Sequence, residues 1–503
     1  MNKLDSKKSP GCDGISNSLV KYVISEIVNP LVHIFNLSLR TGIVPGRMKI
    51  AKVIPIFKKG NPKELTNYRP ISLLPTFSKL LEKVVYSRID SFLTKNNILC
   101  ESQFGFRKKC TTIHAVLKSV NTIAESIDKL SHTIGVFLDF SKAFDSVNHD
   151  ILLYKLSRYG IRGQSLDWFK NYLENRKQFV VVNGCESCIK PVKCGVPQGS
   201  LLGPLLFLLF VNDFPKSSSL LTFTLFADDS SLFYSHRDPA RLLNIFNLEL
   251  TNVFNWVKAN KMSLNVSKCN YMIFSKRHPN LTSHIAIDGK DLTRVESTKF
   301  LGLIIDQNLS WKPHLDNLAK LLSRNAGIIY KLKNAVPSNI LFMIYNALLM
   351  SHLNYGLLAW GTAPKLYVDR ILLIQKRALR SVFSLNFRSH TTNVFFVNKT
   401  LKIHDLYLFQ LGILMFQTHE SKLPISLSYL FLKNSKIHNY STRQQNLFHL
   451  PRKRTKFAQN TVFYTGPKFW NNLPLHITSS PSLPIFKRRL KLHLLAPYNG
   501  HMN

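Results

Sequence analysis

Two adjacent aspartates interrupt an apolar run at residues 225–233 (LFADDSSLF). Adjacent residues on a regular strand point to opposite faces, so both carboxylates reach one cavity only if a tight turn falls at Asp228 and Asp229. We therefore expect a strand, a short turn and a second strand. Two neighbouring carboxylates repel each other unless a cation lies between them, and oxygen ligands suit hard divalent ions such as Mg²⁺. On its own, such a pair would indicate only an exposed turn.

A third aspartate follows another apolar strand pattern, because Asp139 lies near the end of the run IGVFLDF at 134–140. If both strands belong to one sheet, the three acids converge at its edge, where two metal ions could hold an attacking oxygen and a leaving pyrophosphate. The chain is also basic, with 67 Lys and Arg against 28 Asp and Glu and a formal net charge of +39. This charge favours a polyanionic partner such as nucleic acid, and the acids favour chemistry on phosphates.

Helices and strands are expected to alternate up to about residue 306, with helices alone beyond it. The pair Asn183 and Gly184 between two apolar arms predicts a hairpin. A helix after Phe140 would be capped by Asn148 or Ser146. The other expected helices are at 19–39, 77–93, 314–336, 339–360 and 368–383; the other expected strands are at 53–57 and 71–74 and within 221–235, 260–274 and 297–306.

Seven segments occur in the order of the sequence blocks of reverse transcriptases, and the chain resembles those of non-LTR (LINE-type) retrotransposons over about residues 40–306. The segments are IPIFKKGNPKELTNYRPISLL (54–74), SQFGFRKKCTT (102–112), FLDFSKAFDSVNHDILL (137–153), GVPQGSLLGPLLFLLFVND (195–213), FADD (226–229), SLNVSKCNYMIF (263–274) and KFLGLIID (299–306).

The resemblance implies an α+β fold of the right-hand polymerase type, with fingers, a ferredoxin-like palm and a helical thumb. We expect an N-terminal linker and helix at 1–39, fingers and palm at 40–306, the thumb at 307–385, and a basic C-terminal region of unknown function at 386–503. We find no pattern of the N-terminal endonuclease that many such proteins carry, nor of RNase H or a CCHC zinc knuckle. A 5′-truncated copy or a gene model that begins late is therefore expected.

The resemblance also implies the catalytic groups. Asp139, Asp228 and Asp229 would hold two Mg²⁺ ions, with Mn²⁺ as a substitute. Lys268 would approach the leaving pyrophosphate as a proton donor, although a solvated lysine is the alternative. Asp145 is acidic and near in sequence, but we expect it to cap the following helix rather than bind metal.

Further residues would bind the nucleotide and the primer. Phe144 would exclude ribonucleotides by blocking a 2′-hydroxyl, unless it is only a core residue. Lys58 and Arg69 would hold the triphosphate, Arg69 as a fork and Lys58 as a point charge, with a solvated lysine again the alternative for Lys58. Gln198 and Gly199 would line the incoming nucleotide; Phe300, Leu301 and Gly302 would support the primer end.

The implied activity is RNA-directed DNA polymerase, a nucleotidyltransferase whose partners are an RNA template, a DNA primer or target, and dNTPs. One alternative is a catalytically silent retroelement remnant that only binds nucleic acid. Another is an intron-encoded reverse transcriptase with a role in RNA splicing, which would need a maturase-like domain after the thumb. The oligomeric state is not indicated.

Localisation is expected to be intracellular and nuclear. No secretory signal is visible, and the longest apolar run, LLGPLLFLLFV at 201–211, is too short to span a bilayer. Seven scattered cysteines suit a reduced compartment, and the CESC segment at 185–188 has no second ligand pair nearby to complete a zinc site. The run Arg452, Lys453 and Arg454 is a weak candidate for a nuclear import signal. No acidic residue follows Glu420, which favours phosphate contacts by the C-terminal region.

Overall fold

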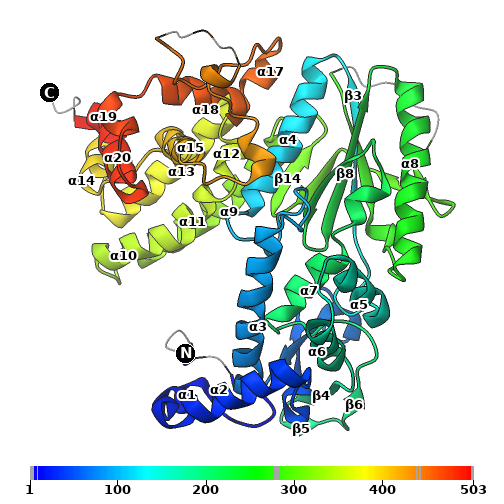
Figure 1. The fold of residues 1–503 in the computed structure, drawn as a ribbon. Helices are drawn as coiled ribbons and strands as arrows, with labels where there is room; N and C mark the ends of the chain where they lie inside the picture. Colours follow the sequence, from blue (N-terminus) through cyan, green and yellow to red (C-terminus); the bar gives the residue numbers. More distant parts are fainter. Residues whose placement is uncertain (1–4, 8, 277–283, 438–439, 441–442, 500–503) are drawn as a thin grey trace.

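The computed structural model describes residues 5–7, 9–276, 284–437, 440 and 443–499. The structure has two strand-containing parts and a helical part. The N-terminal helices lie at the bottom and the C-terminal helices at the left of Figure 1. The expected α+β fold class is confirmed. No helix in the described ranges is both long enough and apolar enough to cross a membrane.

The central sheet has the strand order β12-β9-β3-β8-β7. Within this sheet the pairs β9–β3, β3–β8 and β8–β7 are antiparallel, and β12 pairs with β9 in parallel. Along the chain the order is β3, α7, β7, β8, α8, β9, which is a βαββαβ unit with its last strand beside its first. The expected ferredoxin-like palm is therefore confirmed. The bounds are β3 His132–Leu138, α7 Leu202–Phe210, β7 Thr222–Phe226, β8 Asp229–His236, α8 Pro239–Ala259, β9 Asn270–Phe274 and β12 Thr293–Arg294.

The two faces of this sheet belong to different hydrophobic cores. Successive strand residues point to opposite faces. Ile134 and Val136 pack in one core with α7 and α8, whereas Phe137 packs in a second core with α4 (Thr112–Asp128). In Figure 1 α4 and α8 accordingly lie on opposite sides of the strands. Buried on both faces, the strands leave only their ends accessible for a site.

A second sheet, of order β2-β1-β4-β5 with β6 beside β4, forms the fingers. The hairpin expected at Asn183 and Gly184 is confirmed, because both residues have positive φ angles of 50° and 82° and join β4 to β5. The sheet contains β1 Ile50–Phe57, β2 Tyr68–Leu73, β4 Lys177–Val182, β5 Cys185–Glu186 and β6 Lys190–Pro191. The helices of this part are α1 Asn17–Tyr22, α2 Ile24–Thr41, α3 Thr76–Lys95, α5 His149–Arg158 and α6 Gln164–Leu173.

The single helix expected at 19–39 is wrong, because the chain breaks at Val23 between α1 and α2. The buried side chain of Asn17 holds the start of α1 in place. It donates to the Asp5 carbonyl and accepts from the Thr76 hydroxyl, so α1 is fixed against the start of α3 independently of α2.

The β13–β14 hairpin (Ser297–Phe300 and Leu303–Asp306) leads into the helical thumb, in which α9 packs along α13. The helix expected at 339–360 is interrupted, because Gly356 has φ 66° and an added Cβ would lie 2.6 Å from Leu303. The chain therefore turns where it meets β14. The thumb helices are α9 Lys312–Leu332, α10 Ser338–Tyr345, a π-helical turn at Asn346–Met350, α11 Ser351–Asn354, α12 Leu357–Trp360 and α13 Lys365–Val382.

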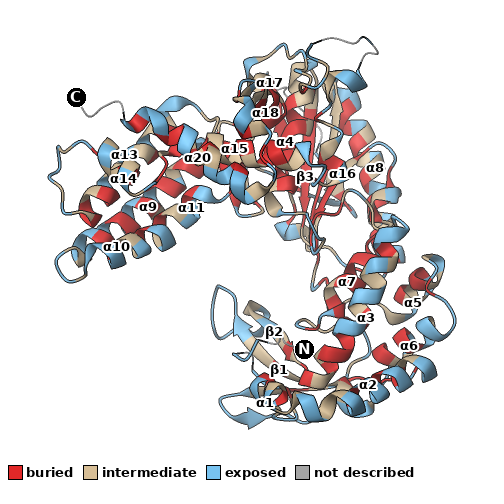
Figure 2. Ribbon diagram, turned by 60° about the vertical axis from the view of Figure 1, so that its left-hand side comes forward, coloured by how far each residue is buried: buried red, intermediate tan, exposed pale blue. Residues whose placement is uncertain are grey.

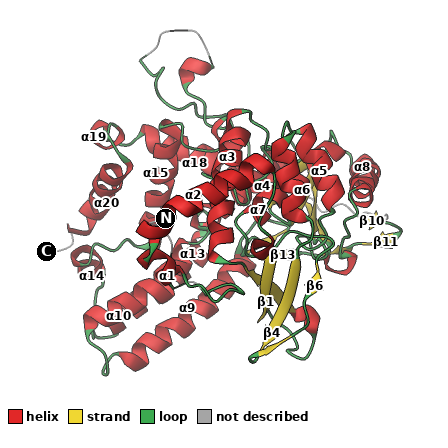
Figure 3. Cartoon of the chain, turned by 60° about the horizontal axis from the view of Figure 1, so that its bottom comes forward, coloured by secondary structure: helices red, strands yellow, loops and turns green. Residues whose placement is uncertain are grey.

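The C-terminal region continues the thumb core without a break at residue 385. One hydrophobic cluster runs from α4 through α9 and α13 into α15, α18 and α20, and Figure 2 shows buried residues along these helices. α14 and α20 lie at the end of this part remote from the β-strands (Figure 3). The helices are α14 Thr392–Val397, α15 Ile403–His419, α16 Ile425–Ser428, α17 Lys456–Gln459, α18 Val462–Asn471, α19 Leu475–Thr478 and α20 Leu483–Asn499.

Candidate active site

The adjacent aspartates lie at the turn between β7 and β8. Phe226 pairs with Asp229, so Ala227 and Asp228 form the two-residue connection. Ala227 has φ 58°, a left-handed conformation that costs a non-glycine residue roughly 1–2 kcal/mol. Both aspartate side chains are exposed at this end of the sheet. The turn thus brings two consecutive carboxylates out of an otherwise buried hairpin.

Asp139 lies beside this turn on the neighbouring strand. The last pair of the β3–β8 ladder is Leu138 with Ser230, so Asp139 directly follows β3 where Asp229 begins β8. Its backbone is held by the Asn265 amide, which donates to the Asp139 carbonyl at 2.8 Å. The Asp139 side chain is 47% exposed, and Lys268 Nζ lies 4.0 Å from its Oδ2. One lysine and three acids therefore lie at one end of the palm sheet.

The charges of these groups act on one another. The pKa of Asp229 is raised to about 6, first by desolvation and then by the charges of Asp228 and Asp139. The pKa of Asp228 is also raised, chiefly by desolvation and in addition by Asp139. Because both side chains keep contact with water, solvent moderates this repulsion. The cluster has an excess of negative charge that a cation would relieve.

The side chains of Asp139, Asp228 and Asp229 do not converge on one position. Within the described ranges, no three His, Cys, Asp or Glu side chains are close enough together to hold one metal ion. The carboxylates of Asp228 and Asp229 nevertheless have the oxygen chemistry and the mutual repulsion that suit a hard divalent ion. The donor set fits such an ion, provided that the side chains rotate toward it.

Two cations on the fingers hairpin face the acids. Lys58 and Arg69 lie on opposite arms, since Arg69 pairs with Ile56 and the Lys58 amide donates to the Asn67 carbonyl. Both side chains are exposed, and their positive charges lower the pKa values of Asp228 and Asp229 against the dominant desolvation. The fingers and the palm therefore present opposite charges across a shared space.

Phe144 and Gln198 lie close to each other, because Gln198 binds Asp145, the residue that follows Phe144. The Phe144 ring stacks on buried Phe207 at 4.5 Å and remains partly exposed. Gln198 Nε2 donates to Asp145 Oδ1 at 2.9 Å, and the Gln198 carbonyl accepts from the Ser72 amide. The expectation that Asp145 caps the next helix is wrong, because the Asn148 side chain caps α5 and Asp145 instead orients Gln198.

Gly199 is required where the chain passes β2. It has φ 120°, and an added Cβ would lie 2.5 Å from the Ser72 carbonyl oxygen. Only glycine permits this approach. The segment carrying Gln198 is thus pressed against the fingers sheet.

The three residues expected at the primer end form the β13–β14 turn. Leu301 and Gly302 have φ angles of 46° and 83° and connect the two strands. The Tyr355 hydroxyl donates to the Leu301 carbonyl at 2.6 Å, which ties the turn to the thumb. Phe300 is only 5% exposed and contacts Phe137, so it supports the turn from the core rather than from the surface.

A further residue, Gln103, was not assigned a role by the sequence. It is 2% exposed, and its Oε1 accepts hydrogen bonds from the amides of Ala227 at 3.0 Å and Gly105 at 2.8 Å. An added Cβ on Gly105 would lie 2.3 Å from the Ala227 nitrogen. The segment SQFGF at 102–106 therefore clamps the turn that carries Asp228. The sequence offered one indication of this role: Gln103 lies inside SQFGFRKKCTT, one of the seven segments that resemble reverse transcriptase blocks.

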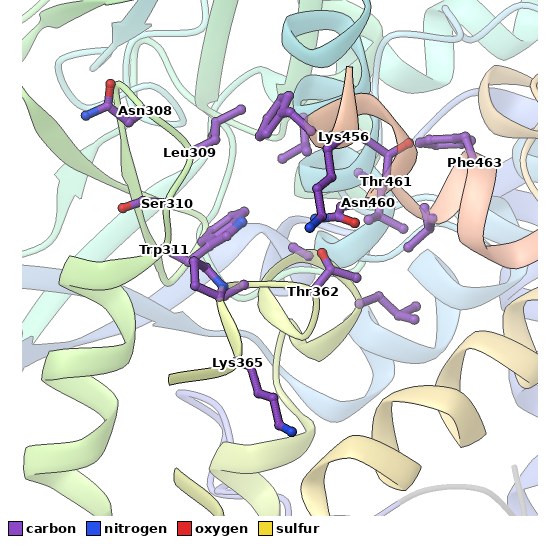
Figure 4. A pocket seen from close by; sticks show the side chains of 18 residues that line it. Asn308, Leu309, Ser310, Trp311, Thr362, Lys365, Lys456, Asn460, Thr461 and Phe463 are labelled. Carbon is purple, nitrogen blue, oxygen red and sulfur yellow. The ribbon is translucent and has the colours of Figure 1, made fainter. Parts of the chain in front are cut away.

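A cavity of about 520 Å³ lies elsewhere, between α4, the β14–α9 loop, the α12–α13 connection and α17–α18. Figure 4 shows Trp311, Lys365 and Lys456 among its lining side chains. None of the three acids lines it. It is therefore a junction between palm, thumb and C-terminal region, distinct from the acid cluster.

Comparison with known proteins agrees with this geometry. Residues 56–305 match the family model "Reverse transcriptase (RNA-dependent DNA polymerase)". The chain is 32% identical to the probable RNA-directed DNA polymerase from transposon BS of Drosophila melanogaster, over 76% of this chain and 43% of that protein. It is 29% identical to the RNA-directed DNA polymerase from mobile element jockey of the same organism, over 80% and 45%. The chain thus spans less than half the length of these relatives.

A similarity to solved structures is weaker. Telomerase from Candida albicans in complex with a fragment of telomeric RNA aligns with 75% of this chain and 68% of its own, with 12% identity and a TM-score of 0.40.

Proposed function

Through residues 56–305 the chain belongs to the reverse transcriptase family of the type found in non-LTR retrotransposons, and from this premise we propose that it catalyses RNA-directed DNA synthesis. A primer 3′-oxygen would attack the α-phosphorus of a dNTP. The new P–O bond would form as the bond between the α- and β-phosphates breaks, and pyrophosphate would leave. The observation that carries this proposal is the acid cluster at the end of the palm sheet, opposite Lys58 and Arg69.

Reverse transcriptases normally use divalent metal ions. We propose that Asp139, Asp228 and Asp229 hold two Mg²⁺ ions, or Mn²⁺ in their place, which would supply charge neutralisation and activate the primer hydroxyl. Lys58 and Arg69 would bind the triphosphate, since both are exposed cations facing the acids. Lys268, 4.0 Å from Asp139, would donate a proton to the leaving pyrophosphate.

The nucleotide and the primer would be positioned by the surrounding elements. The Phe144 ring, fixed by stacking on Phe207, would occupy the space that a 2′-hydroxyl needs. Gln198 and Gly199 would line the base and sugar, with Asp145 fixing the Gln198 amide. The turn at Leu301 and Gly302 would support the primer end, held by Tyr355 and by buried Phe300.

The partners of the whole protein are part of the proposal: an RNA template, a DNA primer or target, and dNTPs. The expected nuclear location stays a prediction. The run at 452–454 is folded against α4, because Lys453 pairs with Glu125 at 3.5 Å and Arg454 Nε donates to the Asp128 carbonyl. An import receptor would have to displace these contacts to bind the run.

The experiment is primer extension by the purified chain on poly(rA)/oligo(dT) with dTTP and Mg²⁺, beside the matching DNA template. Extension on the RNA template supports the proposal. The alternative is a silent remnant that only binds nucleic acid. It predicts tight, salt-sensitive binding of the template and primer but no incorporation of dTTP, with either Mg²⁺ or Mn²⁺. A splicing role would instead appear as accelerated intron release with no need for dNTPs.

A further inference from the structure

Four lysines gather where the thumb meets the C-terminal helices, outside the acid cluster. We call Lys376, Lys399, Lys402 and Lys491 the lysine junction. They come from α13, from the connection between α14 and α15, and from α20. The contacts that bring these three elements together are specific, and they fix where the lysines lie.

The first contact joins α13 to the connection before α15. Gln375, 1% exposed, donates from Nε2 to the Leu401 carbonyl at 3.0 Å and accepts from the Ile403 amide at 3.1 Å. Lys376 follows Gln375, and Lys402 lies between the two residues that Gln375 binds. A buried amide with both of its ends satisfied therefore holds these two lysines next to each other.

The second contact joins the same connection to α20. The Lys402 amide donates to the Tyr498 hydroxyl at 3.0 Å, and Lys402 Nζ lies 4.4 Å from the centre of the Tyr498 ring. Tyr498 also packs against Phe395 of α14, with ring centres 6.3 Å apart. Lys491 precedes Tyr498 by seven residues on α20 and so lies on the same helix face. This brings Lys491 toward Lys399, which follows α14.

These lysines repel one another, and the charge of Asp405 only partly offsets this repulsion at Lys402. The pKa of Lys402 is lowered by desolvation and then by the charge of Lys376; that of Lys491 is lowered by desolvation and then by Lys399. In the part of the chain that the structure describes, no ion pair involves any of the four. Asp405 also accepts a hydrogen bond from the Tyr498 hydroxyl. A cluster of like charges costs stability that a bound polyanion would restore.

We propose that the lysine junction binds the phosphate backbone of a nucleic-acid strand at a second site, separate from the catalytic groove. Its charges are spread over three elements rather than enclosed in a pocket, which suits successive phosphates along a strand better than one small anion. No acidic residue after Glu420 opposes such contact. In Figures 1 and 3, α14 and α20 lie at the far end from the palm strands. A strand held here would extend beyond the segment being copied.

The test measures binding of the full chain in EDTA, so that it does not depend on polymerase activity. Fluorescence anisotropy would compare single-stranded RNA, single-stranded DNA and duplex DNA over a series of salt concentrations. Replacing two lysines together, Lys399→Gln with Lys491→Gln, should weaken binding about tenfold and make the slope of log K against log salt shallower by about 1.4 on a single strand and about 1.8 on a duplex. The nucleic acid whose affinity falls most in the variant is the type of strand that the lysine junction binds.

A matched control replaces two exposed palm lysines, Lys216→Gln with Lys290→Gln, and removes the same charge. Because the lysines of the junction repel one another, the melting temperature of the test variant should be no lower than that of wild type. A second pair, Lys376→Gln with Lys402→Gln, should show the same loss of binding and the same melting temperature. Extension of a short template and primer should be unchanged. The proposal would be overturned if both test pairs bound nucleic acid as tightly as wild type. It would also be overturned if the control variant lost as much affinity as the test pairs.

Discussion

The backbone amide of Ala227 donates a hydrogen bond of 3.0 Å to Gln103 Oε1, although 124 residues separate the two. The same oxygen accepts from the Gly105 amide, and Gly105 packs directly on the Ala227 backbone. Ala227 has a left-handed conformation beside Asp228. A buried side chain on one segment therefore supports an unfavourable turn on another, and that turn carries two of the proposed metal ligands.

Replacing this clamp should impair catalysis more than substrate binding. Gln103→Ala leaves two buried amides without their acceptor, at about 1–3 kcal/mol each, and lets the turn shift. We expect kcat for dTTP incorporation to fall about 10²-fold, as for a misplacement of about 1 Å, while KM changes little. Gly105→Ala should act alike because its Cβ has no room; Gly46→Ala, which has open space, is the control. Normal kcat in both clamp variants would show that the turn does not need them.

Phe144 should govern the choice of sugar. Phe144→Ala opens the space beside the proposed 2′ position, so rNTP incorporation should rise and discrimination against rNTPs should fall roughly 10- to 200-fold. Competing dTTP and UTP incorporation measures it. If Phe144 is only a packing residue against Phe207, stability will drop and the ratio will stay unchanged. Phe387→Ala removes an exposed ring elsewhere in the chain and serves as the control.

Lys268 should act in the chemical step. Lys268→Ala removes the proposed proton donor next to Asp139, so single-turnover incorporation should slow about 10²-fold. The slowing should persist at saturating dTTP, which loss of a merely solvated lysine would not cause. Lys216→Ala is the matched exposed control. Single-turnover incorporation by Lys268→Ala at the wild-type rate would remove Lys268 from the mechanism.

Asp128 should make stability depend on pH, because it ties the C-terminal region to α4. Its carboxylate accepts from the Thr455 amide at 2.7 Å and hydroxyl at 2.8 Å. Desolvation alone would raise the pKa of Asp128, but these bonds and the Arg454 amide outweigh it and lower the pKa.

A lowered carboxyl pKa contributes stability above the unfolded value of about 3.9 and loses it as pH falls through the folded value. Asp128→Asn should therefore destabilise the chain by about 1 kcal/mol at pH 7, and the difference should shrink as the pH falls through the lowered pKa of Asp128. Thermal melts across pH, with Asp288→Asn as control, test this. A difference that stays constant with pH would contradict the role of the charge.

Turns and strands that depend on neighbouring residues were predictable from the sequence. Features that depend on contacts between distant segments were not. The Asn183–Gly184 turn and the hairpin at Asp228 follow from local residue preferences and apolar patterning. The ferredoxin-like order came with the resemblance to a family. In contrast, the position of α1 depends on Asn17 binding Thr76, and the break at Gly356 depends on contact with Leu303. No window of sequence contains both partners.

The same division holds for the site. Asp139 and the aspartate pair were found because each ends or turns an apolar strand. The role of Asp145 was mistaken because its partner, Gln198, lies 53 residues away. Gln103 was missed because its partner is a backbone amide, which leaves no mark in the sequence.

The most direct measurement is single-nucleotide incorporation on an RNA template by wild type, Asp228→Asn and Asp288→Asn. We predict that Asp228→Asn lowers the rate at least about 10³-fold. It should melt no lower than wild type, since it removes one of several repelling carboxylates, and the exposed Asp288→Asn control should incorporate normally. Incorporation by Asp228→Asn at the wild-type rate would contradict the assignment of catalysis to the acids at the end of the palm sheet.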